Sequence, residues 1–265
     1  MGSRQWGEVY PAAPLLNDPW CERLKRSAPK TPLEPADRNM IHVERVTSAW
    51  HSASTSITVL DDVTIELPTS ERLAVLGRER SGKTTLIRLL SGLILPTSGI
   101  ITRYARVSFP AGYMGGYKNA LSVRENIAHA ARLYGAEVNQ VVEFVCELTG
   151  LGIALREPYG NVPQLYRQRL AYAVSYALPF DVYLIDNKIA AGGSEFRRRC
   201  EQIFEERTQS SGFILATNTP RYAKRFANKG AILYNGKIVL YNDFESAIWD
   251  FDRLGNPLAP MGMGI

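Results

Sequence analysis

The fold class of this chain follows from one stretch, Gly77-Arg78-Glu79-Arg80-Ser81-Gly82-Lys83-Thr84. It fits the pattern Gly-x-x-x-x-Gly-Lys-Ser/Thr, follows the apolar run 72–76 and precedes the helix-like run 85–90. This strand–loop–helix context is the one that a phosphate-binding loop requires. Its glycines let successive backbone N–H groups face one phosphate, and the helix N-terminus adds a favourable dipole potential. We therefore predict that the loop, with Thr85, binds a nucleoside triphosphate, with Lys83 at the β- and γ-phosphates and Thr84 on Mg²⁺.

The overall composition limits the class of protein. Its 265 residues, 45% of them hydrophobic, are enough for one α/β unit with a substantial core. No run of about 20 apolar residues occurs, and the first residues lack the order of a secretory signal, so we expect no membrane span. The cysteines Cys21, Cys146 and Cys200 lack metal-ligand spacing and fit a reducing compartment. The net charge of +5 comes without an aromatic-interleaved basic face, so we expect no nucleic-acid partner.

The segments before the loop form two parts. Residues 1–39 are rich in proline and show no sustained period, so we interpret them as an N-terminal extension. Alternating apolar residues predict strands over 41–46, 56–60 and 63–67. These strands lead into the buried run 72–76, and residues 41–76 therefore read as an antiparallel start to a folded domain.

After the loop, helical and strand-like segments alternate. Ser122 and Glu125 are predicted to form a capping box that opens a helix, and a second helix is predicted to end at Gly150 as its C-cap. Asn235-Gly236 lies between two apolar runs and predicts a type I′ hairpin. The other expected elements are a helix over 167–178, a strand over 182–185, a helix around 196–204 and a strand over 212–216. The alternation predicts an α/β fold with a mostly parallel sheet and an added antiparallel part.

The order and spacing of these motifs resemble the nucleotide-binding (ATPase) subunit of an ABC transporter. The similarity is closest to the subfamily that exports capsular polysaccharide and lipopolysaccharide O-antigen chains, and it covers about residues 40–250. It rests on the loop as Walker A, on Leu93-Ile94-Leu95-Pro96-Thr97-Ser98-Gly99, on Leu121-Ser122-Val123-Arg124-Glu125-Asn126 and on Val182-Tyr183-Leu184-Ile185-Asp186 as Walker B. The resemblance implies a P-loop NTPase fold with an antiparallel β subdomain, a helical subdomain over about 120–178 and a C-terminal tail over 251–265.

The resemblance also implies which groups hold the ligands, ATP and Mg²⁺. Trp50 falls where the family places the aromatic residue that stacks on adenine, although packing at a strand end is the alternative role. Asp186 ends an apolar strand and joins Thr84 in the Mg²⁺ shell, because this hard cation prefers oxygen ligands.

Several positions depart from the family pattern. The glutamate that polarises the attacking water is replaced by Asn187, and the switch histidine by Asn218. An amide cannot accept the proton of water, and general-base catalysis is worth about 10²–10⁴-fold. The signature loop is replaced by a stretch with Pro163 and Leu165, and no glutamine occurs between Ser108 and Leu121. We expect a subunit that binds ATP and hydrolyses it poorly or not at all.

The expected role is the ATP-binding subunit of an exporter, on the cytoplasmic face of the inner membrane. Its expected partners are an integral-membrane permease subunit and a second ATPase subunit, which is either the same chain or a homologue. Two other functions remain open: a nucleotide-binding regulatory or scaffold protein without a transport role, and a small-molecule kinase, in which Arg167 and Arg169 would imitate a lid.

Overall fold

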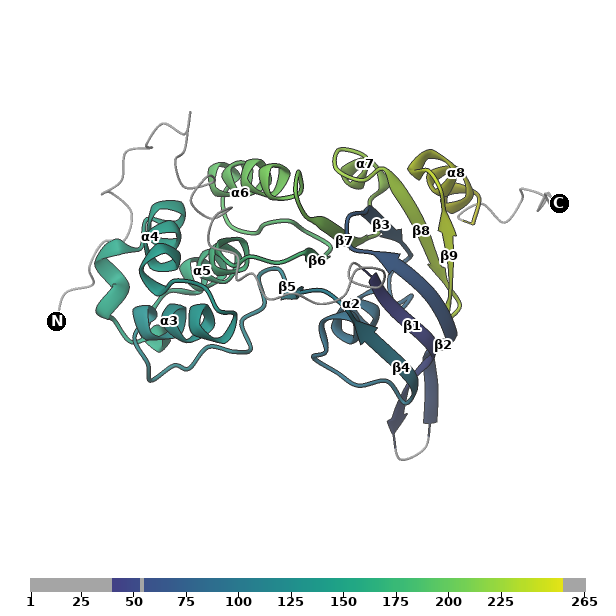
Figure 1. Ribbon diagram of the computed structural model, residues 1–265, viewed down its shortest axis with the longest axis horizontal. Coiled ribbons are helices and arrows are strands. Elements are labelled where there is room, and N and C mark those ends of the chain that lie inside the picture. Colours follow the sequence, from purple (N-terminus) through teal and green to yellow (C-terminus); the bar gives the residue numbers. More distant parts are fainter. Residues whose placement is uncertain (1–39, 53–54, 255–265) are drawn as a thin grey trace.

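The computed structural model describes residues 40–52 and 55–254, which form two β-sheets and a group of helices (Figure 1). The larger sheet has six strands in the order β5-β6-β7-β3-β8-β9, all parallel except β9. Its strands are β3 Arg72–Leu76, β5 Val107–Pro110, β6 Val182–Asp186, β7 Gly212–Thr217, β8 Lys229–Tyr234 and β9 Lys237–Tyr241. The predicted α/β fold with a mostly parallel sheet is confirmed.

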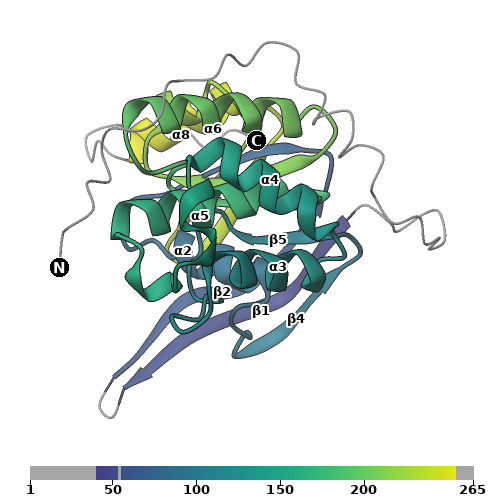
Figure 2. The same ribbon diagram turned by 90° about the vertical axis from the view of Figure 1, so that its left-hand side faces the viewer.

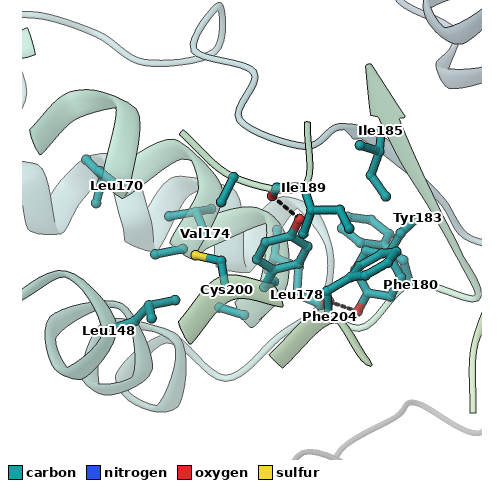
Figure 3. Packing of buried hydrophobic residues seen from close by; sticks show 14 of the residues in the cluster. Leu148, Leu170, Val174, Leu178, Phe180, Tyr183, Ile185, Ile189, Cys200 and Phe204 are labelled. Carbon is teal, nitrogen blue, oxygen red and sulfur yellow. Dashed lines mark hydrogen bonds between the residues drawn. The ribbon is translucent and has the colours of Figure 1, made fainter. Parts of the chain in front are cut away.

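The central strands are almost entirely apolar, as expected of a parallel sheet that is covered on both faces. All six residues of β7 are buried, as are four of the five residues of β6. On one face, Leu73 and Val75 share a core with the helix α2 Lys83–Ser91 and with the smaller sheet. The other face packs against the remaining helices, and there the rings of Phe180 and Tyr183 meet edge to face at 5.8 Å (Figure 3).

The smaller sheet is antiparallel and has the order β2-β1-β4. Its strands are β1 Met40–Ser52, β2 Thr55–Pro68 and β4 Ser98–Arg103. The predicted strands 56–60 and 63–67 are in fact one strand, β2, with an irregular register against β1. Asp62 looks like a turn residue, but the sheet accommodates it: its N–H donates to Thr47 Oγ1 at 3.1 Å, and its carboxylate lies 3.3 Å from Nε of Arg45. Both Asp62 and Arg45 have a positive φ, as a local bulge allows.

Helices α3 Val123–Leu133, α4 Val138–Thr149 and α5 Gln164–Ala177 gather at one end of the molecule (Figure 1), the end that faces the viewer in Figure 2. The predicted capping box is confirmed: Glu125 N–H donates to Ser122 Oγ, and Ser122 N–H donates to Glu125 Oε2. Gly150 ends α4 in the left-handed conformation, as predicted. The helix predicted from residue 167 starts earlier, at Gln164, because the Pro163 carbonyl accepts hydrogen bonds from the first turn.

The C-terminal part completes the covering of the sheet. It contains α6 Ser194–Arg207, α7 Pro220–Ala223 and α8 Phe244–Leu254. Asn235 and Gly236 both have a positive φ between β8 and β9, which confirms the type I′ hairpin. Helix α8 continues four residues past the predicted domain end at residue 250. The predicted N-terminal extension (1–39) and most of the predicted tail lie outside the described residues, and among those described no helix combines the length and apolar character needed to cross a bilayer.

Candidate functional site

A cavity of about 370 Å³ opens where the loop between β3 and α2 faces the ends of β6 and β7. It is lined by Val59, Glu79, Arg80, Ser81, Gly82, Lys83, Thr84, Thr85, Asn187 and Asn218. These residues come from four separate segments, β2, the loop with the start of α2, and the residues just after β6 and β7. The carboxyl ends of parallel strands meet at one edge of the sheet, which is where ligands bind in such folds.

The loop has the tight curvature that the sequence predicts. Gly77 N–H donates to the Thr217 carbonyl, which fixes the loop to β7. Gly82 has a φ of 102°, and a Cβ there would lie 2.7 Å from Val59 Cγ1. Glycine is therefore required at residue 82 both for its conformation and for the close approach of β2.

The Lys83 ammonium lies inside the loop. Its Nζ donates to the carbonyls of Gly77 at 2.8 Å and of Arg78 at 2.6 Å, and the side chain is buried. Burial lowers the pKa of Lys83, and the negative charges of Asp186 and Glu79 oppose that change. An ammonium held by carbonyls at the base of a phosphate loop is placed to exchange one of them for a phosphate oxygen.

Thr84 and Asp186 meet although they lie 102 positions apart in the sequence. Thr84 Oγ1 donates to Asp186 Oδ2 at 2.8 Å, whereas Asp186 Oδ1 is buried without a hydrogen-bond partner among the described residues. A buried carboxylate oxygen without a partner is unfavourable by itself. Together with the Thr84 hydroxyl, it is the type of oxygen donor that Mg²⁺ prefers, so these residues fit the metal.

Asn187 and Asn218 follow β6 and β7 and line the same cavity. The Asn187 backbone has a φ of 69°, a left-handed conformation that asparagine adopts more readily than most residues. Thr219 Oγ1 donates to Asn218 Oδ1 at 3.1 Å. Neither amide carries a charge or accepts a proton near neutral pH, so this side of the cavity offers hydrogen bonds but no base.

Trp50 lies on β1 outside the group of residues that line the cavity, and it is 58% exposed. Its cross-strand neighbour is Ile57, which lies two residues before Val59 on β2. Two residues along a strand span about 7 Å, so Trp50 stands one side chain beyond the cavity wall. The stacking of Trp50 on adenine stays a prediction.

Val59 is a lining residue that the sequence analysis did not identify. Its contact with Gly82 depends on how the small sheet lies against the loop, and no local sequence signal encodes that arrangement. Residues 161–169 are absent from the cavity lining; in that stretch, α5 begins after Pro163 and Leu165 is exposed.

Comparisons with known proteins agree with this geometry. Residues 60–190 match the family model described as "ABC transporter". The chain is 36% identical over 209 residues to the ATP-binding protein BexA of Haemophilus influenzae, covering 78% of this chain and 96% of BexA. It is 34% identical over 216 residues to the capsule polysaccharide export ATP-binding protein CtrD of Neisseria meningitidis serogroup B, covering 81% of this chain and all of CtrD.

The fold also matches that of a solved dimeric ATP-binding cassette in a post-hydrolysis state with ADP and phosphate. The TM-score is 0.63 at 16% sequence identity, and the match covers 75% of this chain and 96% of the other. At this identity the match concerns the fold alone.

Proposed function

The chain belongs to the ABC transporter family, and from this premise we propose that it is the ATP-binding subunit of a polysaccharide or glycolipid exporter. The observation that carries the proposal is the meeting of the phosphate loop with Asp186, whose buried Oδ1 lacks a partner among the described residues. The cargo class is inferred from the name of CtrD. The match covers the whole length of CtrD and 81% of this chain. Such a subunit works on the cytoplasmic face of the inner membrane, where ATP is available.

The loop residues 77–85 are proposed to bind the phosphates of ATP, and Trp50 to stack on its adenine. Lys83 would exchange its contacts with the Gly77 and Arg78 carbonyls for phosphate oxygens. Thr84 and Asp186 would hold Mg²⁺, which neutralises phosphate charge when bound. The hydrogen bond from Thr84 Oγ1 to Asp186 Oδ2, at 2.8 Å, holds these two oxygens next to each other before any ligand binds.

Hydrolysis is proposed to be slow. Asn187 stands where the family has its glutamate, and its amide orients a water without accepting the proton. Asn218 has a shorter reach than the histidine it replaces. Catalytic groups that act as one unit do not contribute additively. The loss of either the glutamate or the histidine is therefore enough to leave slow turnover.

The proposed partners are an integral-membrane permease subunit and a second ATPase subunit. In a pair of identical chains, each site would face a helix α5 that begins after Pro163, which has no N–H, with Leu165 in place of a small residue. A homologous ATPase subunit as partner would supply its own α5 to this chain's site. In that pair this chain's site would still lack its base, and the homologue's site would still face this chain's α5 with Pro163.

Two measurements test the proposal together. The first is binding of Mg-ATP to the purified chain by calorimetry, with Lys83→Ala expected to weaken it strongly. The second is affinity purification of the tagged chain from detergent-solubilised native membranes, where an integral-membrane subunit is expected to co-purify. The transport role is wrong if ATP binds but only soluble proteins are recovered, and this result would favour the regulatory or scaffold alternative.

A further inference from the structure

Arg80 occupies an unusual place in the phosphate loop. Its φ is 62°, in the left-handed region that glycine adopts freely and that a long side chain adopts only at a cost in free energy. A non-glycine residue in such a conformation persists only where the surrounding structure maintains it, and such residues cluster at binding sites. Here the conformation places an arginine on the cavity wall.

The charges around the cavity show what the guanidinium could contribute. Of the described residues that line it, Lys83 and Arg80 are cations and Glu79 is an anion. Lys83 is buried and held by two carbonyls, whereas Arg80 is exposed. Within the described part of the chain, the structure gives the Arg80 guanidinium neither a hydrogen bond nor an ion pair. Its five N–H donors therefore have no acceptor among the described residues, and the residue itself lines the cavity.

We propose that the Arg80 guanidinium binds the polyphosphate of the nucleotide directly. This inference rests on the proposed function, since it gives the side chain of Arg80, whose backbone already belongs to the phosphate loop, a contact of its own with the same ligand. Arginine binds phosphate oxygens in a two-pronged geometry, and such charge-assisted hydrogen bonds are stronger than neutral ones. Arg80 offsets the repulsion between Glu79 and the phosphates. It also adds a cation to a site that is lined in part by the neutral amides of Asn187 and Asn218.

Substitutions at residue 80 separate the guanidinium from the backbone conformation. Arg80→Gly removes the cation and relieves the left-handed strain, and Arg80→Asn removes the cation while keeping a residue that accepts this conformation. We expect both variants to bind Mg-ATP about tenfold more weakly or worse, since one charge-assisted contact is lost. We expect Arg80→Gly to raise the melting temperature of the nucleotide-free chain.

The matched control is Arg88→Gln, which removes one exposed positive charge from helix α2 without touching the cavity. Its dissociation constant for Mg-ATP should stay within about twofold of the wild-type value, because exposed charges about 10 Å apart are largely screened at physiological salt. Measuring ATP and ADP in parallel locates the contact. A loss confined to ATP supports a contact with the terminal phosphate, and an equal loss supports one with a phosphate that ATP and ADP share.

The inference is overturned if Arg80→Gly binds Mg-ATP as tightly as the wild type, or more tightly. It is equally overturned if Arg88→Gln weakens binding as much as Arg80→Gly, since the effect would then be one of net charge. Failure of the proposed function looks different: in that case the wild-type chain binds no Mg-ATP, and Lys83→Ala changes nothing.

Discussion

Gly82→Ala is the substitution whose effect follows most directly from the geometry of the loop. The φ of 102° lies outside the range that L-residues tolerate, and the new Cβ would lie 2.7 Å from Val59 Cγ1 and 3.1 Å from the Val59 carbonyl oxygen. Backbone strain and overpacking each cost about 1–3 kcal/mol, so we expect a destabilisation of about 2–6 kcal/mol. The variant should still fold, because the total stability of a domain is about 5–15 kcal/mol.

The assay is thermal unfolding of the nucleotide-free chain, followed by titration with Mg-ATP. For a chain of this size, each kcal/mol shifts the melting temperature by about 2–4 °C, so Gly82→Ala should melt about 4–24 °C lower than the wild type. It should also lose most ATP affinity, since either the loop or β2 must shift. Gly116→Ala is the matched control, because a Cβ there meets nothing within 4 Å. If Gly82→Ala melts and binds as Gly116→Ala does, the loop geometry described above is wrong.

Three further predictions follow from single residues. Asn187→Glu should raise the rate of phosphate release from ATP by less than about tenfold, because Asn218 is unchanged and a glutamate at a φ of 69° is strained. A gain of about 10²-fold or more would show that only the general base was missing. Ser122→Ala removes an N-cap and should lower stability by about 1 kcal/mol in denaturant titration, whereas an unchanged midpoint would contradict the role of the capping box. Burial raises the pKa of Tyr172 to about 12, so above pH 10 the unfolded chain loses a proton that the folded chain keeps, and stability falls as pH rises. Tyr172→Phe should make that fall shallower by up to about 1.4 kcal/mol per pH unit, and a slope equal to the wild type would refute the shift.

Local chemistry explains why part of the fold is predictable from sequence. The capping box at Ser122, the glycine end of α4 and the Asn235-Gly236 hairpin each depend on a few adjacent residues, so their sequence signals are complete. The phosphate loop is predictable for the same reason. The bulge at Asp62 is different, because it depends on Thr47 and Arg45 of the neighbouring strand.

The residues of the site also differ in how far their positions can be predicted from the sequence. The contact of Thr84 with Asp186 is long-range, but the parallel-sheet topology brings the ends of β3 and β6 to one edge and makes it predictable. Val59 was missed because its place depends on the packing of one sheet against the loop of the other. The positive φ of Arg80 has no sequence signal, since arginine is not a residue that indicates a left-handed turn.

We propose above all that this chain binds ATP at the loop and hydrolyses it slowly. The most direct test is Mg-ATP hydrolysis by the chain assembled with its native membrane partner, with nucleotide binding measured on the same sample and Lys83→Ala as the control. We expect saturable binding of Mg-ATP that Lys83→Ala abolishes, with turnover no higher than that of this control. Turnover above about 1 per second, abolished by Lys83→Ala, would contradict it and would mean that other residues replace the missing base.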